Sequence, residues 1–166
     1  MPTIPNEKLA RRTLMRAGLA AALGTLPLLA ASKAPSANSV VEVWKSPSCG
    51  CCNDWIRHLR AYGFDVQAHE VSDAAKRDLR QRLGLADHFG SCHTALVGGY
   101  VVEGHVPARE IQRMLKERPR ALGLAVPGMP VGAPGMDGPE YGGQKDPYAV
   151  LLVQRDGGSS VYQSYR

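Results

Sequence analysis

The sequence lacks several features that would assign it to a class at once. Its 166 residues include only four cysteines, two phenylalanines and two tryptophans, and aromatic residues make up 6% of the chain. No repeat of solenoid length is visible, which argues against a stacked-repeat architecture. A membrane-spanning helix needs about 20 apolar residues, and the uncharged run at residues 17–31 is shorter than that. The length of residues 35–166 suits a single domain.

The net positive charge is also small once the N-terminus is set aside. The whole chain carries a net charge of +5, but residues 1–34 hold five basic residues and one acid, so residues 35–166 carry +1. No basic stripe with interleaved aromatic residues remains. Nucleic acid is therefore not expected as a partner.

Residues 1–34 resemble a secretory signal peptide. Arg11, Arg12 and Arg16 precede the uncharged run, which ends in the small residues Ala30-Ala31-Ser32. The paired arginines resemble the twin-arginine variant, which exports folded proteins. The alternatives are an uncleaved membrane anchor and an amphipathic core helix, although the run has no one-sided apolar stripe. We expect export to the periplasm, with no stable membrane association after cleavage.

Residues 35–166 are predicted to form one domain. Apolar periodicity and turn residues predict elements in the order β-α-β-α-β-β-α. The first helix is expected from Asn53 to Tyr62, directly after the cysteines, and Gly98-Gly99 is expected to turn a hairpin. This order predicts an α/β fold, a thioredoxin-like mixed four-stranded sheet with helices on both faces.

A C-terminal extension, residues 121–166, follows. Residues 123–147 contain twelve Gly or Pro in twenty-five positions, so no regular element is expected there. Two strand-like segments, Tyr148 to Val153 and Ser160 to Tyr165, then predict a β-hairpin. Because isolated hairpins are marginal in water, we expect it to pair with the sheet and the Gly/Pro-rich loop to wrap the domain.

Three of the four cysteines, Cys49, Cys51 and Cys52, lie within four residues. Disulfides at such spacing are strained, so a framework of stapling disulfides fits poorly. Cys49 and Cys52 form a Cys-x-x-Cys pair between a strand and a helix. The N–H groups and dipole of a helix N-terminus stabilise thiolates, the form that exchanges disulfides and binds metals. The pair alone leaves both chemistries open.

Two features favour metal binding over disulfide exchange. The first is Cys51, which a two-electron dithiol does not need, and the second is the pair Cys92 and His93. This pair precedes the third expected strand, where a thioredoxin-like fold faces its dithiol, so Cys92 and His93 are expected to meet the first cluster. Thiolates and imidazole favour Cu(I), zinc or an iron–sulfur cluster. His105, Met129 and Met136 are candidate additional ligands, and thioethers favour copper.

The spaced motifs resemble the CopG-like copper-resistance proteins, a family of small exported proteins. The resemblance covers about residues 40–166. It is carried by the motifs Cys49-Gly50-Cys51-Cys52 with Trp55, Ser91-Cys92-His93-Thr94-Ala95, Gly99-Tyr100-Val101, Glu103-Gly104-His105-Val106-Pro107-Ala108 and Gly123-Leu124-Ala125-Val126-Pro127-Gly128-Met129-Pro130.

The resemblance implies a thioredoxin-like protein that binds copper in the periplasm, as Cu(I) or in exchange between Cu(I) and Cu(II). The implied ligands are Cys49, Cys51, Cys52 and Cys92, with His93, His105, Met129 and Met136 as additions. The expected partners are copper ions and other periplasmic copper-handling proteins, and the protein is expected to be a monomer.

Two other functions fit the residues. One is a thiol–disulfide oxidoreductase, in which Cys49 attacks and Cys52 resolves. The other is a structural zinc module, which would need its metal to fold. The residues therefore do not decide whether the protein is an enzyme.

Overall fold

The computed structural model describes residues 40–166, so the predicted signal peptide lies outside the described residues. The helices are α1 (Gly50–Ala61), α2 (Asp73–Arg82) and α3 (Ala108–Glu117), with short 3-10 turns η1 (Asp87–Phe89) and η2 (Pro139–Tyr141). The strands are β1 (Val40–Lys45), β2 (Asp65–Glu70), β3 (His93–Val97), β4 (Tyr100–Glu103), β5 (Gly123–Ala125), β6 (Tyr148–Val153) and β7 (Ser159–Tyr165). Within the described part of the chain, no helix is both long and apolar enough to span a bilayer.

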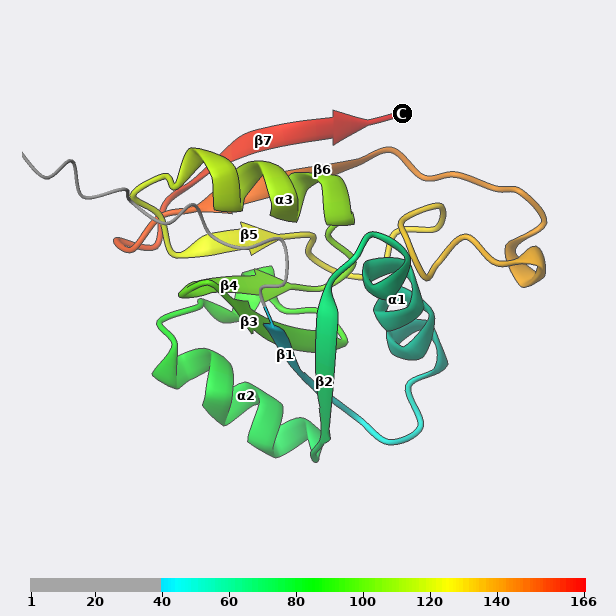
Figure 1. Ribbon diagram of the computed structural model, residues 1–166, viewed down its shortest axis with the longest axis horizontal. Coiled ribbons are helices and arrows are strands. Elements are labelled where there is room, and N and C mark those ends of the chain that lie inside the picture. The colour runs from blue at the N-terminus through cyan, green and yellow to red at the C-terminus, as the bar shows by residue number, and fades with distance from the viewer. Residues whose placement is uncertain (1–39) are drawn as a thin grey trace, which may run out of the picture. The chain divides into compact units, whose positions relative to one another are not determined.

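The strands form one mixed sheet in the order β2-β1-β3-β4-β5-β6-β7 (Figure 1). The pairs β1–β2 and β4–β5 are parallel, and the other neighbouring pairs are antiparallel. Gly98 and Gly99 connect β3 to β4 with φ angles of 56° and 85°, the left-handed conformation that such a tight hairpin requires. The hairpin predicted at this position is confirmed.

The α/β class is confirmed, and so is the expectation that the C-terminal hairpin pairs with the sheet. The expectation of a four-stranded sheet is wrong, because the sheet has seven strands. β5 pairs with β4, and the predicted C-terminal hairpin, β6 and β7, pairs with β5. Val150 and Val153 are thereby buried. The extension thus shares the core of the domain.

Two apolar cores lie on opposite faces of the sheet. On one face α1 and α3 contribute Trp55, Leu59, Ile111 and Met114, which pack with strand residues that include Leu124. On the other face a smaller cluster forms around the segment after α2, with Leu85, Phe89, Leu122, Val101 and Val153. Each fully buried side chain of this size contributes about 1.5–3 kcal/mol.

The structure differs from the predicted elements at two places. α1 begins at Gly50 rather than Asn53, so Cys49 is its N-cap residue and Cys51 and Cys52 lie in its first turn. Residues 123–147 contain β5 and η2, although no regular element was expected there. β5 forms despite a glycine-rich sequence because Gly123 packs against β4, where a Cβ would collide with the backbone of Val101.

Candidate metal centre

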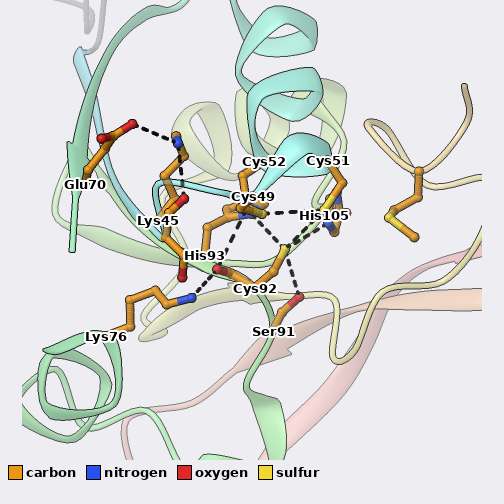
Figure 2. Close-up of a disulfide and its surroundings, with 12 residues drawn as sticks. Lys45, Cys49, Cys51, Cys52, Glu70, Lys76, Ser91, Cys92, His93 and His105 are labelled. Carbon is orange, nitrogen blue, oxygen red and sulfur yellow. Dashed lines mark hydrogen bonds and ion pairs between the residues drawn. A yellow bond between two sulfur atoms is a disulfide. The ribbon is translucent and has the colours of Figure 1, made fainter. Parts of the chain in front are cut away.

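The three cysteines at the N-terminus of α1 lie next to Cys92, which directly precedes β3. The Sγ atoms of Cys49 and Cys51 are 3.6 Å apart, and the Sγ atoms of Cys51 and Cys92 are 4.0 Å apart. The Sγ atoms of Cys49, Cys51, Cys52 and Cys92 all lie within 4.8 Å of one another, as Figure 2 illustrates. The expected meeting of Cys92 with the first cluster is confirmed.

Cys49 and Cys52 are joined by a disulfide, with their Cα atoms 5.4 Å apart, whereas Cys51 and Cys92 are free thiols. Cys52 is fully buried and Cys49 is partly exposed. The structure therefore represents the oxidised state of the Cys-x-x-Cys pair, and Cys49 is the sulfur of this pair that solvent can reach.

Cys92 belongs to a second group of donors as well. Its Sγ lies 3.3 Å from Nδ1 of His93 and 3.1 Å from Nε2 of His105, and the donor atoms of these three residues also lie within 4.8 Å of one another. Both predicted histidines are thus brought to the cysteines. Cys92 is the sulfur that the two groups share.

His105 is held in one tautomer by the chain around it. Its Nδ1 lies 2.8 Å from the carbonyl oxygen of Pro134, which can only accept, so Nδ1 carries the proton. Nε2 of the neutral ring is then a free lone pair that faces Cys92. A histidine whose second nitrogen donates to a carbonyl is the arrangement common in metal sites.

His93 is completely buried, with its ring centroid 4.2 Å from that of Trp55 and 5.1 Å from that of His105. Its Nε2 has no hydrogen-bond partner. Its Nδ1, 3.3 Å from Cys92 Sγ, is the ring nitrogen on the side of the cysteines and is therefore the candidate donor of this residue.

A loop crosses the site, and we call residues 126–147 the strap. A Cβ at Gly135, where φ is 85°, would lie 2.6 Å from the backbone oxygen of Cys51, so the strap touches the first turn of α1. The next residue, Met136, is buried, and its Sδ accepts a hydrogen bond from Tyr141 Oη at 3.4 Å. Met129 is 53% exposed. The structure thus separates the two predicted methionines into one buried and one exposed side chain.

The remaining histidines lie in other settings. His58 accepts a hydrogen bond from the backbone N–H of Ala108 at the start of α3, His69 pairs with Glu42, and His88 lies against Phe89. None of the three belongs to either donor group.

The chain is similar to a described protein family and to solved structures. Residues 89–136 match a family described as "Protein of unknown function, DUF411". The solved structure titled "Copper resistance protein copG- Form 1" is 44% identical, with 76% of this chain and 96% of that chain covered and a TM-score of 0.69. The structure titled "Copper resistance protein copG- Form 2" is 43% identical, with 78% and 99% covered and a TM-score of 0.71. No curated protein matches.

The chain belongs to the CopG-like copper-resistance family. The matched segment 89–136 includes Cys92, His93, His105 and both methionines, but not the cluster at residues 49–52. The two halves of the site therefore come from different parts of the CopG-like sequence.

Burial sets the protonation of this CopG-like site. It raises the pKa of Cys92 to about 12, and the neighbouring Cys51 contributes in the same direction. Burial also lowers the pKa of His93 well below its ordinary value of 6.5, and lowers that of His105. At neutral pH the metal-free site thus holds a protonated Cys92 thiol beside two uncharged imidazoles.

Three polar residues beside Cys92 were missed at the level of sequence. Nζ of Lys76 donates to the carbonyl oxygen of Cys92 at 2.7 Å, and the buried carboxylate of Glu103 lies close by with Arg80. Lys76 and Arg80 lie in α2, a helix of mostly polar residues, and nothing in the sequence around them indicates that they are buried. The one signal in the sequence is Glu103, an acidic residue at the end of the apolar strand β4, which could have indicated a buried charge.

Proposed function

We propose that this CopG-family protein binds Cu(I) through the thiolates of Cys49, Cys51, Cys52 and Cys92 and serves in copper resistance. The observation that carries the proposal is the convergence of four sulfur atoms within 4.8 Å. Thiolate is the ligand that Cu(I) prefers. The titles of the two similar structures support copper as the metal.

The nitrogen donors fit the same proposal. Nε2 of His105 and Nδ1 of His93, the ring nitrogens that lie 3.1 Å and 3.3 Å from Cys92 Sγ, belong to uncharged imidazoles, the form that binds metals. Because Cys92 is shared between the sulfur group and the histidine group, we propose that it can bridge two copper ions. Met136 supplies a thioether on the strap beside α1, a further ligand type suited to copper.

The disulfide makes binding depend on redox state. A disulfide sulfur is no longer a thiolate, so Cys49 and Cys52 bind copper only after the bond takes up two electrons and two protons. We therefore propose that the reduced form is the high-affinity form, and that the oxidised form retains Cys51 and Cys92 with the two histidines.

Copper analysis of the exported protein from copper-supplemented cells, combined with X-ray absorption at the copper edge, tests the proposal. We expect copper in a sulfur-rich shell in the reduced protein and much less copper in a variant with all four cysteines changed to serine. Equal Cu(I) retention by the two proteins against a competing chelator would refute it. Zinc in place of copper, with unfolding on chelation, would instead identify a structural zinc module.

Thiol–disulfide exchange is a second candidate, favoured by the disulfide at the N-terminus of α1. A substrate thiolate would attack the partly exposed Sγ of Cys49, and Cys52 would leave as a thiolate that the helix N-terminus stabilises. A second substrate thiol would then release Cys49, leaving the substrate oxidised and the protein pair reduced. Such activity should survive Cys92→Ser, whereas copper binding should not.

We place the protein in the periplasm on a thioredoxin-like scaffold. The support is the arginine-containing leader and the Cys-x-x-Cys pair between β1 and α1. Cell fractionation of the wild type and of a variant with Arg11→Lys and Arg12→Lys tests the location. Export unaffected by the double change would argue against the twin-arginine route and leave the copper proposal intact.

A further inference from the structure

α2 packs on the sheet through charged side chains. Its buried residues are Lys76 and Arg80, whose side chains are 7% and 10% exposed. These residues are four apart and therefore lie on one face of the helix. Burying cations is costly unless they are paired, so their partners indicate what the burial achieves.

The partner of Arg80 is Glu103, the last residue of β4, which is completely buried. Its Oε1 lies 3.4 Å from Arg80 Nη1 and accepts a hydrogen bond from the backbone N–H of Ser91 at 2.7 Å. Its Oε2 accepts from the hydroxyl of Thr94 at 2.6 Å. One carboxylate therefore accepts hydrogen bonds from the residues immediately before and after Cys92-His93.

Lys76 acts on the same segment between those two points. Its Nζ donates to the carbonyl oxygen of Cys92, as Figure 2 shows, and its one carboxylate partner, Asp73, is 72% exposed. Three points of the segment, at Ser91, Cys92 and Thr94, are thus held by buried charged groups. At Thr94 this contact adds to the β3–β4 pairing of Thr94 with Glu103.

We infer that Glu103, together with Arg80 and Lys76, is a positioning network that holds Cys92 and His93 in the geometry needed to bind copper. This inference rests on the proposed function. Buried ion pairs often add little to stability and some specify one conformation, and residues that orient metal ligands commonly change metal affinity 10–100-fold when mutated. α2 is then a support of the metal site rather than only a cover of the sheet.

Two nearly isosteric variants test the network in the full chain. Glu103→Gln removes the charge that faces Arg80, and Thr94→Val removes the hydroxyl that donates to Oε2. Glu110→Gln is the matched control, because Glu110 is also buried but its neighbour is Tyr165 on β7. With Cu(I) chelator competition on reduced protein, we expect Glu103→Gln to weaken binding about 10- to 100-fold. Thr94→Val should weaken it about 3- to 10-fold, the range of one hydrogen bond.

A second measurement needs no metal. In the oxidised protein, Cys51 and Cys92 are the free thiols, and their alkylation rates can be compared by mass spectrometry. A loosened segment should speed alkylation of Cys92 in both variants, with Cys51 on α1 serving as the internal reference. The Glu110→Gln control should leave the ratio of the two rates unchanged.

The outcomes separate this inference from the proposed function. If the wild type binds copper and both variants bind within twofold of the Glu110→Gln control, the network does not position the ligands. If the wild type binds no Cu(I), the proposed function fails, and the ratio of alkylation rates alone decides whether the network holds Cys92. An unchanged ratio in both variants would overturn the inference in that case.

Discussion

Replacing Cys92 with serine should weaken Cu(I) binding and change its pH dependence. Cys92 is the one sulfur that faces both Cys51 and the two histidines, at 4.0 Å, 3.3 Å and 3.1 Å. Losing it removes a ligand from both donor groups. We expect the affinity to fall by more than about 100-fold, because even residues that only orient a ligand cost about 10–100-fold.

The pH dependence follows from the proton on Cys92. Burial and the neighbouring Cys51 raise the pKa of Cys92 to about 12, so the thiol is protonated throughout the physiological range. Forming the thiolate at neutral pH therefore has a free-energy cost, which copper binding must offset. Binding therefore releases one proton from Cys92, and the logarithm of the affinity should rise by about one for each pH unit from this residue.

Competition titrations with a Cu(I) chelator at pH 6, 7 and 8 measure both quantities in the reduced protein. Relative to the wild type, Cys92→Ser should lower the slope of log affinity against pH by about one, since serine releases no proton. His69→Gln, on β2 and paired with Glu42, is the control and should leave the slope unchanged. Equal slopes in the wild type and Cys92→Ser would refute the assignment of Cys92 as a thiolate ligand.

Three further predictions concern the stability of the metal-free protein, measured as the free energy of unfolding in urea. Burial lowers the pKa of both site histidines below 6.5, so the unfolded chain binds more protons and stability should fall as the pH drops through about 6.5. His105→Gln should make this loss of stability smaller, and a pH profile equal to that of the wild type would contradict the prediction. Gly135→Ala should cost about 1–3 kcal/mol because of its positive φ and its contact with α1, whereas Gly142→Ala, also at positive φ but in open space, should cost less; equal losses would show that the contact is unimportant. Leu124→Ala in β5 should cost about 2–5 kcal/mol and the exposed Val161→Ala less than about 0.5 kcal/mol, unless the extension folds apart from the core.

Most elements could be predicted from local patterns. The alternation in β1 and β2, the helical spacing of Trp55 and Leu59, and the Gly98-Gly99 turn were sufficient to predict the order of the first seven elements. The start of α1 was placed late because Gly50, Cys51 and Cys52 carry no helical periodicity. Their helical conformation comes from the packing of Cys52 into the core and from the turn in which Cys49 N–H donates to Ser46.

The size of the sheet could not be predicted in the same way. β5 has three residues and begins with glycine, so it has no strand signal of its own and forms because β4 and β6 pair with it on either side. Tertiary pairing here overrides local preference. The sequence predicted that the C-terminal hairpin pairs with the sheet, but it did not reveal β5, the strand through which the hairpin joins the first four.

The candidate site was predictable in its sulfur and histidine donors but not in its supports. Clustered cysteines and a Cys-His pair are rare enough to draw attention to Cys92 and His93. By contrast, Lys76 and Arg80 resemble the solvent-facing side of a polar helix, and only the fold reveals that Glu103 lies opposite them. Buried charge pairs of this kind are set by partners distant in sequence.

Two hydrogen bonds within the strap turn its middle part into a closed loop. Val131 N–H donates to the carboxylate of Asp146 at 3.0 Å, and Asp146 N–H donates to the carbonyl of Val131 at 2.8 Å. These two hydrogen bonds join the ends of the segment 132–145. This closed segment carries Pro134, which holds His105, and Met136, yet it contributes no strand to the sheet. Local opening of this segment would therefore break no strand pairing. We expect the sulfur ligands to set how tightly copper is held, and the opening of this segment to set how quickly copper is exchanged with another protein.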